Sequence, residues 1–519
     1  MNRLFSRTPI GLRAAVGLSL SALVTAVLIA CGGGGVGSNG TGLAPAQGLS
    51  SGTVTGFGSV IVDGARFDDL TARISIEREP SLFSATETRL GQAVEINFDP
   101  DQTGTLSGVA REIHIDPALA GPVGSIGTSG LTLIGQTVMI NADPTIGPVT
   151  VFEPPYTALA DVRAGDWVEM HGVPLPATRT PNGLPGWLAT RIEKHVSTGM
   201  MRIRARVSQL VAGQGFELGA LSVRLGGATQ FLSGNDQLAN GQIVTVFAPE
   251  ASWQPATASV LPSVVAHSIR IRDRLSARVS LTATPEEFRS GVIESLRADA
   301  SIPGWRFEID GVPVVVDPTT ALIPPAAALV DGLYVRVQGR FSATGELLST
   351  VIQQRGAIPD NQIELYGTLL ARTGIPVGTS FLVRDVPVDA STATINLGDC
   401  ATLNPQLASL TEGLYVEVHG RPTPDGGVRA NTVTCKDASM ISGAVIEVIG
   451  TIAAMNATQS ALEIQRADGT TLRVRWTDTT YFRDVSISDP PLTPVKVEGV
   501  VDLSSGTPVL VATKIKLAN

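Results

Sequence analysis

The sequence contains few of the residues that usually carry chemistry. Its 519 residues include only three cysteines and five histidines, and aromatic residues make up 5%. No two histidines have H-x-x-x-H spacing and no two cysteines have C-x-x-C spacing, so the ligand patterns typical of zinc sites are missing. We therefore expect no metal site and no cofactor.

Motifs for a catalytic nucleophile are also missing. There is no S-x-x-K box. Residues Gly48 to Gly52 spell G-x-S-x-G and residues Gly35 to Gly40 spell G-x-G-x-x-G, but neither segment has the strand before it and the helix after it that a nucleophile elbow or a phosphate-binding loop requires. The sequence thus predicts no catalytic residue, and we expect that the protein is not an enzyme.

Positive charge is scarce. The chain has 38 basic and 47 acidic residues, for a net charge of −9, and only five of the basic residues are lysine. Removing the first thirty residues takes away three arginines and no acid, which moves the charge from −9 to −12. Nucleic acids and anionic membrane surfaces bind to a surplus of lysine and arginine, so we expect no nucleic acid partner.

The first thirty residues have the pattern of a secretory signal. Arg3, Arg7 and Arg13 precede an uncharged run of seventeen small or apolar residues, from Ala14 to Ala30. The alternative is a transmembrane helix, but the run is short for spanning a bilayer and a glycine-rich segment follows it in place of basic residues. Residues 1–30 are predicted to be a signal peptide.

The end of this segment, Leu28-Ile29-Ala30-Cys31, resembles the lipobox of bacterial lipoproteins. The resemblance implies that Cys31 becomes the mature N-terminus and carries both a diacylglyceryl thioether and an acylated amine. Several acyl chains together give stable attachment to a membrane. Gly32 in the second position resembles lipoproteins that are sorted to the outer membrane, on either of its faces. Residues 31–50, rich in Gly and Ser, are predicted to be a flexible tether.

Two cysteines remain once Cys31 is assigned to the lipid anchor. In an exported protein, Cys400 and Cys435 are expected to form a disulfide, with two free buried thiols as the alternative.

Beyond the tether, one pattern recurs six times. A strand of the form V-x-V-x-G, or a close variant, starts at Val94, Val168, Val244, Val335, Val416 and Val495. In five copies a glycine lies three residues upstream, at Gly91, Gly165, Gly241, Gly332 and Gly413, whereas the sixth copy has prolines nearby. A second strand follows each time, with Ala-x-x-Ile or a variant of it, as in Ala110 to Ile113 and Ala512 to Ile515. Each pair of strands predicts a β-hairpin.

Earlier segments of the units alternate with a period of two, and no unit has a helical stripe. The fold class is therefore all-β, with about six tandem small OB-like β-barrels of roughly 70 to 80 residues each. The predicted repeats span residues 51–116, 121–194, 201–272, 290–355, 363–436 and 443–517. The alternative is a six-bladed β-propeller, for which these repeats are long.

This layout resembles exported bacterial lipoproteins built from tandem copies of a domain of unknown function. Their hallmark is Leu-x-x-Gly-x-x-Val-x-Val-x-Gly followed by Ala-x-x-Ile, and the resemblance covers residues 51 to 517. It implies a fold and an exported location but no catalytic residue.

Comparison of the copies tests the remaining candidates for a site. His171 and His419 occupy the same strand position, where other copies have Asn, Phe, Gln and Glu, so we interpret the position as a solvated strand end. The segment from Asp99 to Ser107 is similar to the start of a calcium loop but has Ala110 in place of the final glutamate, which favours a plain turn over weak calcium binding. Glu286 and Glu287 are interpreted as part of a solvated linker.

Three functions follow, in order of preference. The first is a non-enzymatic scaffold of the cell envelope, anchored in the outer membrane through Cys31 and contacting another envelope protein. The second is a module that binds a glycan or another small ligand. The third is an enzyme, which no catalytic constellation supports.

Overall fold

The computed structural model describes residues 48–101, 106–232, 237–271, 286–300, 303–325, 328–355, 363–372, 375, 377, 379–403, 405–438, 444–466, 469–486, 491–502 and 509–518. The predicted signal peptide, Cys31 and most of the tether lie outside these residues. The first strand already begins at Gly48, so the predicted tether of residues 31–50 is too long at its C-terminal end.

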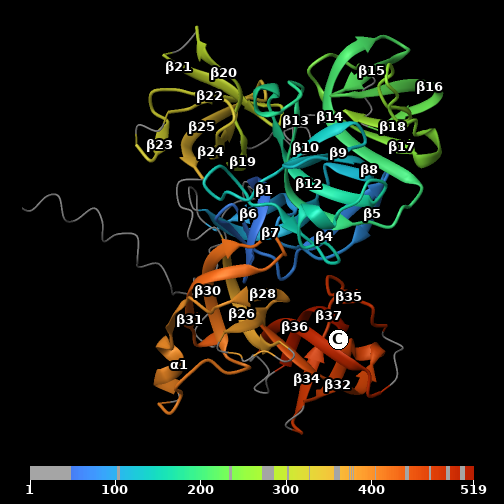
Figure 1. Ribbon diagram of the computed structural model, residues 1–519. Coiled ribbons are helices and arrows are strands. Elements are labelled where there is room, and N and C mark those ends of the chain that lie inside the picture. The colour runs from blue at the N-terminus through green and yellow to red at the C-terminus, as the bar shows by residue number, and fades with distance from the viewer. Residues whose placement is uncertain are drawn as a thin grey trace, which may run out of the picture. The chain divides into compact units, whose positions relative to one another are not determined.

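The regular secondary structure of the described chain is almost wholly strand (Figure 1). The first barrel contains β1 (Gly48–Phe57), β2 (Val60–Val62), β3 (Ala65–Asp68), β4 (Arg73–Glu79), β5 (Leu82–Ala85), β6 (Ala93–Pro100) and β7 (Ser107–Ile115). The second contains β8 (Leu119–Ile126), β9 (Gly130–Leu133), β10 (Gln136–Ile140), β11 (Val151–Phe152), β12 (Trp167–Leu175) and β13 (Gly186–Lys194). The third contains β14 (Met200–Val211), β15 (Gly215–Leu218), β16 (Leu221–Phe231), β17 (Ile243–Pro249) and β18 (Ser263–Ile271).

The remaining three barrels follow the same plan. The fourth contains β19 (Glu286–Val292), β20 (Glu294–Asp299), β21 (Gly304–Ile309), β22 (Val312–Val316), β23 (Ala321–Ile323), β24 (Tyr334–Phe341) and β25 (Leu347–Gln354). The fifth contains β26 (Ile363–Ala371), β27 (Ser380–Val383), β28 (Val386–Asp389), β29 (Thr394–Asn396), the short helix α1 (Gly398–Leu403), β30 (Tyr415–Pro422) and β31 (Val428–Cys435). The sixth contains β32 (Val445–Asn456), β33 (Ala461–Gln465), β34 (Thr471–Arg475), β35 (Tyr481–Arg483), β36 (Pro494–Asp502) and β37 (Val509–Leu517).

Each unit closes on itself through the same circuit of strand pairs. In the first barrel, β1 pairs antiparallel with β2 and with β6, β2 pairs with β3, and β6 pairs with β7. The circuit is closed by β3, which runs parallel to β7. The sixth barrel repeats it with β32, β33, β34, β36 and β37. Five strands closed in this order form a small Greek-key barrel of the OB type. The prediction of OB-like barrels is confirmed, and the alternative of a propeller is wrong.

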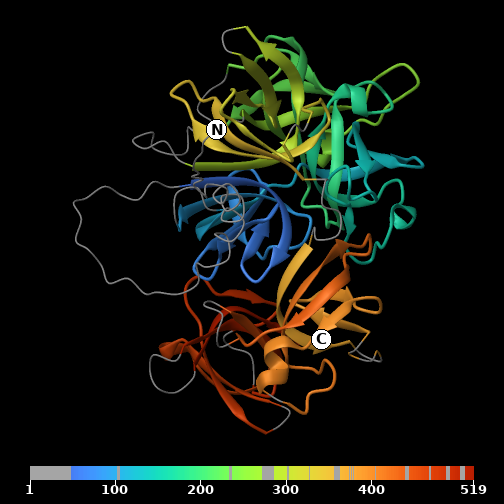
Figure 2. The same cartoon turned by 90° about the vertical axis from the view of Figure 1, so that its left-hand side faces the viewer.

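The V-x-V-x-G strand lines the inside of each barrel, and Figure 2 shows how strongly the blue strands of the first barrel curve. In the fourth barrel Val335 and Val337 are fully buried, and burial of one such side chain contributes roughly 1.5 to 3 kcal/mol. The final glycine, Gly339, lies at a β-bulge between β24 and β25. A Cβ atom there would lie 2.2 Å from the carbonyl oxygen of Leu348. Glycine suits this position because two strands approach closely at the bulge, although the first and third copies have Phe98 and Ala248 there.

The glycine upstream of the motif is required for a different reason. Gly413 has a φ of +89°, a left-handed conformation that costs other residues energy, and its N–H donates to the carbonyl of Leu369 over 2.8 Å. In the sixth barrel Leu492 takes this position with a φ of +70°, and its N–H donates to the carbonyl of Ile452 over 2.7 Å. The turn is thus kept where the glycine is absent.

Residues Ala46–Asn519 form one compact unit, because the barrels are joined to each other. Ladders of backbone hydrogen bonds continue from one barrel to the next: β1 runs parallel to β19 of the fourth barrel and to β26 of the fifth, and β8 pairs with β14. One apolar core is shared by the first and fifth barrels and another by the second and third. The barrels are therefore packed against each other and are not independent beads on a string.

Candidate functional site

The two cysteines predicted to pair do form a disulfide. Cys400 in α1 and Cys435 at the end of β31 are joined, with a Cα–Cα distance of 5.7 Å, and both are buried. The bond ties the short helix to the last strand of the fifth barrel, so it serves the structure of that barrel.

Several outward positions of the V-x-V-x-G strands are not solvated, as the sequence suggested, but are buried between barrels. His171 is completely buried in β12, and its Nδ1 accepts a hydrogen bond of 3.3 Å from the N–H of Ala93 in the first barrel. The neighbouring Glu169 is also completely buried and accepts from Arg78 of the first barrel over 2.9 Å. The interpretation of this position as a solvated strand end is wrong for His171, because a neighbouring barrel covers it, whereas the side chain of His419 is 28% exposed.

The predicted solvated linker at Glu286 and Glu287 is also a buried strand. Both residues belong to β19, which lies between β1 and β24, and Glu287 is completely buried. Arg289 donates to Glu287 over 2.8 Å. Burial nevertheless raises the pKa of Glu287 to about 7, because loss of water disfavours its charged form more than Arg289 favours it.

The described ends of the segment similar to a calcium loop belong to a β-hairpin. It joins β6 to β7, and Asp99 pairs with Arg111 across the hairpin at 2.7 Å. Residues 102–105 of this segment lie outside the described residues.

The first barrel lies at the centre of the polar contacts between barrels. It has polar contacts with each of the other five barrels, through the residue pairs Arg78–Glu169, Glu77–Arg270, Asp63–Tyr334, Arg66–Glu364 and Glu87–Lys514. Buried charges keep a large share of their mutual attraction, because little water is left to screen them, but they cost several kcal/mol each when they are left unpaired. The contacts of the first barrel therefore position the other five barrels by specific partners.

A cluster of ion pairs lies where the first, fifth and sixth barrels meet. Lys514 lies 2.9 Å from Glu87 of the first barrel and 2.6 Å from Glu498 of its own barrel. Arg384 of the fifth barrel lies 3.7 Å from Glu498. Burial opposes the charge of Glu87, but Lys514 and its other basic neighbours outweigh burial and lower the pKa of Glu87 to about 2. Both carboxylates are held ionised between cations.

Two groups of side chains have the composition of a metal site. The first consists of Glu364, Glu417 and His419, whose ligand atoms lie within 4.8 Å of each other. Arg66 contacts Glu364, and Lys436 contacts Glu417 at 2.9 Å. Cations of the protein already balance these carboxylates, so the group is best described as an ion-pair cluster.

The second group consists of Asp385, Glu447 and Glu498. Lys496 lies 2.8 Å from Asp385 and 2.6 Å from Glu447. Here too the side chains that would hold a metal are paired with basic side chains across the junction of the fifth and sixth barrels.

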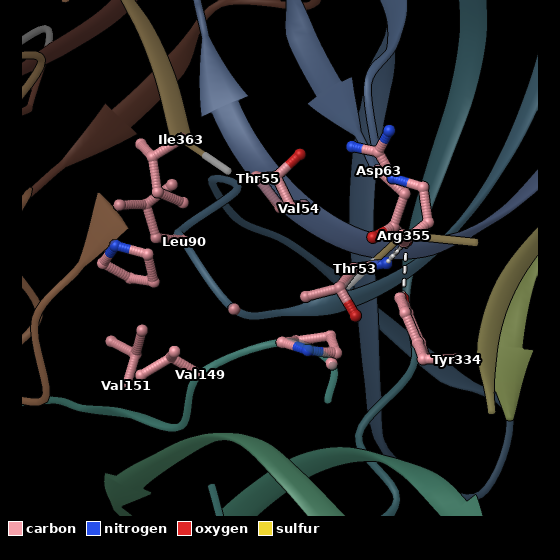
Figure 3. A pocket seen from close by; sticks show the side chains of 14 residues that line it. Thr53, Val54, Thr55, Asp63, Leu90, Val149, Val151, Tyr334, Arg355 and Ile363 are labelled. Atoms are coloured by element: carbon pink, nitrogen blue, oxygen red, sulfur yellow. Dashed lines mark hydrogen bonds between the residues drawn. The ribbon is translucent and has the colours of Figure 1, made fainter. Parts of the chain in front are cut away.

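A small pocket lies where the first, second, fourth and fifth barrels meet (Figure 3). Asp63 accepts hydrogen bonds of 2.9 Å from Tyr334 Oη and from the N–H of Thr53. Burial and the nearby Asp63 raise the pKa of Tyr334 well above its usual value, so the phenol stays a donor. The volume is about 30 Å³, room for about two water molecules and too little for a ligand.

A second cavity is large enough for a small molecule. It has a volume of about 470 Å³ and lies between the β3–β4 turn and β4–β5 hairpin of the first barrel and strands β35, β36 and β37 of the sixth. Arg384 of the fifth barrel completes its wall. Small-molecule sites in proteins usually measure about 300 to 1,000 Å³. This cavity is the candidate site of the described chain.

Two of the barrels match a known family. Residues 290–353 and 371–434 each match the model described as "Domain of unknown function (DUF5666)", and they fall within the fourth and fifth barrels. The chain therefore contains tandem DUF5666 domains. The DUF5666 description assigns no activity to these residues.

The other comparisons contribute less. No curated protein matches the chain. A solved structure described as "drosophila Unr CSD456" matches with 12% sequence identity, 46% of this chain and 97% of that chain covered, and a TM-score of 0.12. A TM-score this low carries no argument, so the assignment of the DUF5666 barrels and their neighbours to the OB type rests on strand pairing.

Sequence reasoning missed the charged junctions and the cavity. Their residues come from different barrels, and the positions differ from copy to copy. A usable indication was the presence of charged residues at the outward positions of the repeated strand, such as Glu169, Lys496 and Glu498.

Proposed function

We propose that this protein is a non-enzymatic lipoprotein of the bacterial cell envelope, anchored in the outer membrane through Cys31, whose six barrels form a scaffold for another envelope component. The observation that carries the proposal is the use of the barrels' outer faces. Glu169, Lys496 and Glu498 face outward from their strands and are nevertheless buried against other barrels. Residues placed in this way hold barrels together.

The anchor is proposed on the lipobox. Among the described residues, no helix combines the length and the apolar character needed to cross a bilayer. Attachment through acyl chains on Cys31 would leave the barrels outside the hydrocarbon layer.

The anchor is tested by labelling cells with radioactive palmitate. The wild-type chain should be labelled and found in the outer-membrane fraction, and Cys31→Ser should carry no label because the thiol that accepts the lipid is gone. Cys400→Ser is the matched control, since it removes a different cysteine and should stay labelled. A labelled Cys31→Ser chain would contradict the anchor.

The scaffold role is tested by photo-crosslinking in living cells. A photoreactive amino acid is placed at exposed positions of different barrels, such as Leu82, Val260 and Val330, which are 56%, 62% and 52% exposed. We expect a discrete crosslinked protein from at least one position, and its loss in the Cys31→Ser background. No crosslinked protein from any barrel surface would refute the scaffold.

A further inference from the structure

We propose that the cavity of about 470 Å³ between the first, fifth and sixth barrels binds a short neutral oligosaccharide. This inference goes beyond the scaffold role and does not depend on it. It rests on the size of the cavity, on the chemistry of its walls and on the cation that faces it.

The walls are polar and nearly balanced in charge. They present seven hydroxyl side chains, four carboxylates and three basic side chains, and the formal charges add up to −1. An apolar ligand would offer no hydrogen bonds to replace those that these groups make with water, which costs roughly 1 to 3 kcal/mol for each group left without a partner. A phosphate or a polyanion would meet more acidic than basic groups. A neutral polyhydroxyl compound suits the walls because every hydroxyl both donates and accepts.

Arg384 provides a specific donor. Its guanidinium lies 5.6 Å from the ring of Phe57, and Nη2 lies 3.7 Å from Glu498. The Nη1 atom is buried and has no hydrogen-bond partner among the described residues. A buried donor without a partner is costly. Because Arg384 is one of the residues that line the cavity, a small movement of its side chain would let Nη1 donate to an oxygen atom of a bound ligand.

The cavity also has an aromatic edge. Phe83 of β5 is 52% exposed and lines the cavity, and Tyr481 of β35 lies on the wall formed by the sixth barrel. The apolar C–H face of a sugar ring can pack on such a ring while its hydroxyls reach polar side chains. Among these, Thr86 and Thr88 lie on the loop that leaves β5.

The geometry implies that the ligand would bridge barrels from opposite ends of the chain. Thr86 and Thr88 belong to the first barrel, and Tyr481 belongs to the sixth. The two walls are held together by Glu87, which contacts Lys514 at 2.9 Å and Arg483 at 2.6 Å. Binding should therefore stabilise this junction in particular.

The test is isothermal titration calorimetry on the full mature protein in a detergent without sugar groups. The probes are maltotriose, cellobiose and N,N′-diacetylchitobiose, with inorganic phosphate as an anionic comparison. We expect saturable binding of at least one saccharide at millimolar or lower concentration. Phe83→Ala, Thr88→Val and Arg384→Lys should each weaken it by about tenfold or more. Trp305→Ala is the matched control, because Trp305 is a 47% exposed aromatic residue of the fourth barrel.

Several results would overturn the proposal. No saturable binding of any of the three saccharides would do so, as would binding of phosphate alone. Binding that all three cavity variants leave unchanged would place the saccharide elsewhere. If Arg384→Lys does not fold, Phe83→Ala and Thr88→Val still decide, because Phe83 is exposed and Thr88 lies on a loop. Labelling at Cys31 and crosslinking are unaffected by these outcomes, so the scaffold proposal is tested separately.

Discussion

At the scale of single residues, several charged side chains are buried between barrels. Glu498 is 1% exposed and has Lys514 at 2.6 Å and Arg384 at 3.7 Å. Burial opposes ionisation of Glu498, but its basic neighbours outweigh burial and lower its pKa. The carboxylate therefore stabilises two cations that are also withdrawn from water.

We expect Glu498→Gln to destabilise the protein by about 3 to 5 kcal/mol, because it leaves Lys514 and Arg384 without their shared counter-charge. The free energy of unfolding is measured in urea. Asp99→Asn is the control, since Asp99 and Arg111 form a pair in which both side chains are at least 30% exposed, and its loss should cost less than about 1 kcal/mol. Equal effects of the two substitutions would show that the buried cluster contributes no more than a surface pair.

Glu287 should make stability depend on pH in the opposite direction from an ordinary carboxylate. Burial raises its pKa from 4.5 to about 7, so the folded state holds a proton that the unfolded state releases between these values. Its contribution to stability is full below pH 4.5 and is lost as the pH rises to about 7. The loss amounts to about 3 kcal/mol, at 1.36 kcal/mol for each pH unit.

Glu287→Gln replaces the protonated acid by a neutral amide of similar shape. Between pH 4.5 and 7.5 the variant should therefore gain about 3 kcal/mol relative to the wild type. Urea unfolding of both proteins across this range measures the difference. A constant difference would mean that Glu287 does not titrate there.

At the scale of elements, the turn before each V-x-V-x-G strand combines a residue in the left-handed conformation with one backbone hydrogen bond that recurs in every copy. The N–H of Gly91 donates to Val54, as that of Gly413 does to Leu369 and that of Leu492 does to Ile452. Leu492 is 72% exposed, so its side chain contributes little packing there. The sixth barrel thus adopts the common turn at the cost of backbone strain.

Reciprocal substitutions test this account. Leu492→Gly should stabilise the sixth barrel by roughly 0.5 to 1 kcal/mol by removing the strain of a φ of +70°. Gly413→Ala should destabilise the fifth barrel by about 1 kcal/mol through its φ of +89°, although no atom crowds its Cβ position. Thermal unfolding of the full protein, compared between each variant and the wild type, measures both changes in stability. Changes of the same sign would rule out backbone strain as the cause.

At the scale of the whole molecule, ion pairs between barrels add to the apolar cores that some of the barrels share. Glu77 of the first barrel is fully buried and accepts a hydrogen bond of 2.7 Å from Arg270 of the third. Burial opposes its charge, but the bond from Arg270 outweighs burial and lowers its pKa. Removal of this carboxylate should loosen two barrels at once.

Hydrogen exchange measures this coupling. Glu77→Gln should increase amide exchange in both the first and the third barrels, because Arg270 and the nearby Arg202 lose their common partner. Arg306→Gln is the control: Arg306 pairs with Asp299 and Glu346, all within the fourth barrel, so its effect should stay in that barrel. If Glu77→Gln affects only the first barrel, the junction does not couple the two.

The sequence by itself determined the fold of each barrel, because the features that specify it are local or repeated. These features are the alternation of the V-x-V-x-G strand, its glycines and the pairing of Cys400 with Cys435. The inward-facing valines pack in the core of every barrel, so comparison of the copies reveals them. Only the tertiary structure decided what the outward residues do. His171, Glu287 and Glu498 look solvent-facing in isolated strands, and they are buried because other barrels cover them. The polar contacts of the first barrel and the cavity exist only where segments distant in the sequence meet. The pattern within one repeat does not indicate which residue of another repeat will contact it.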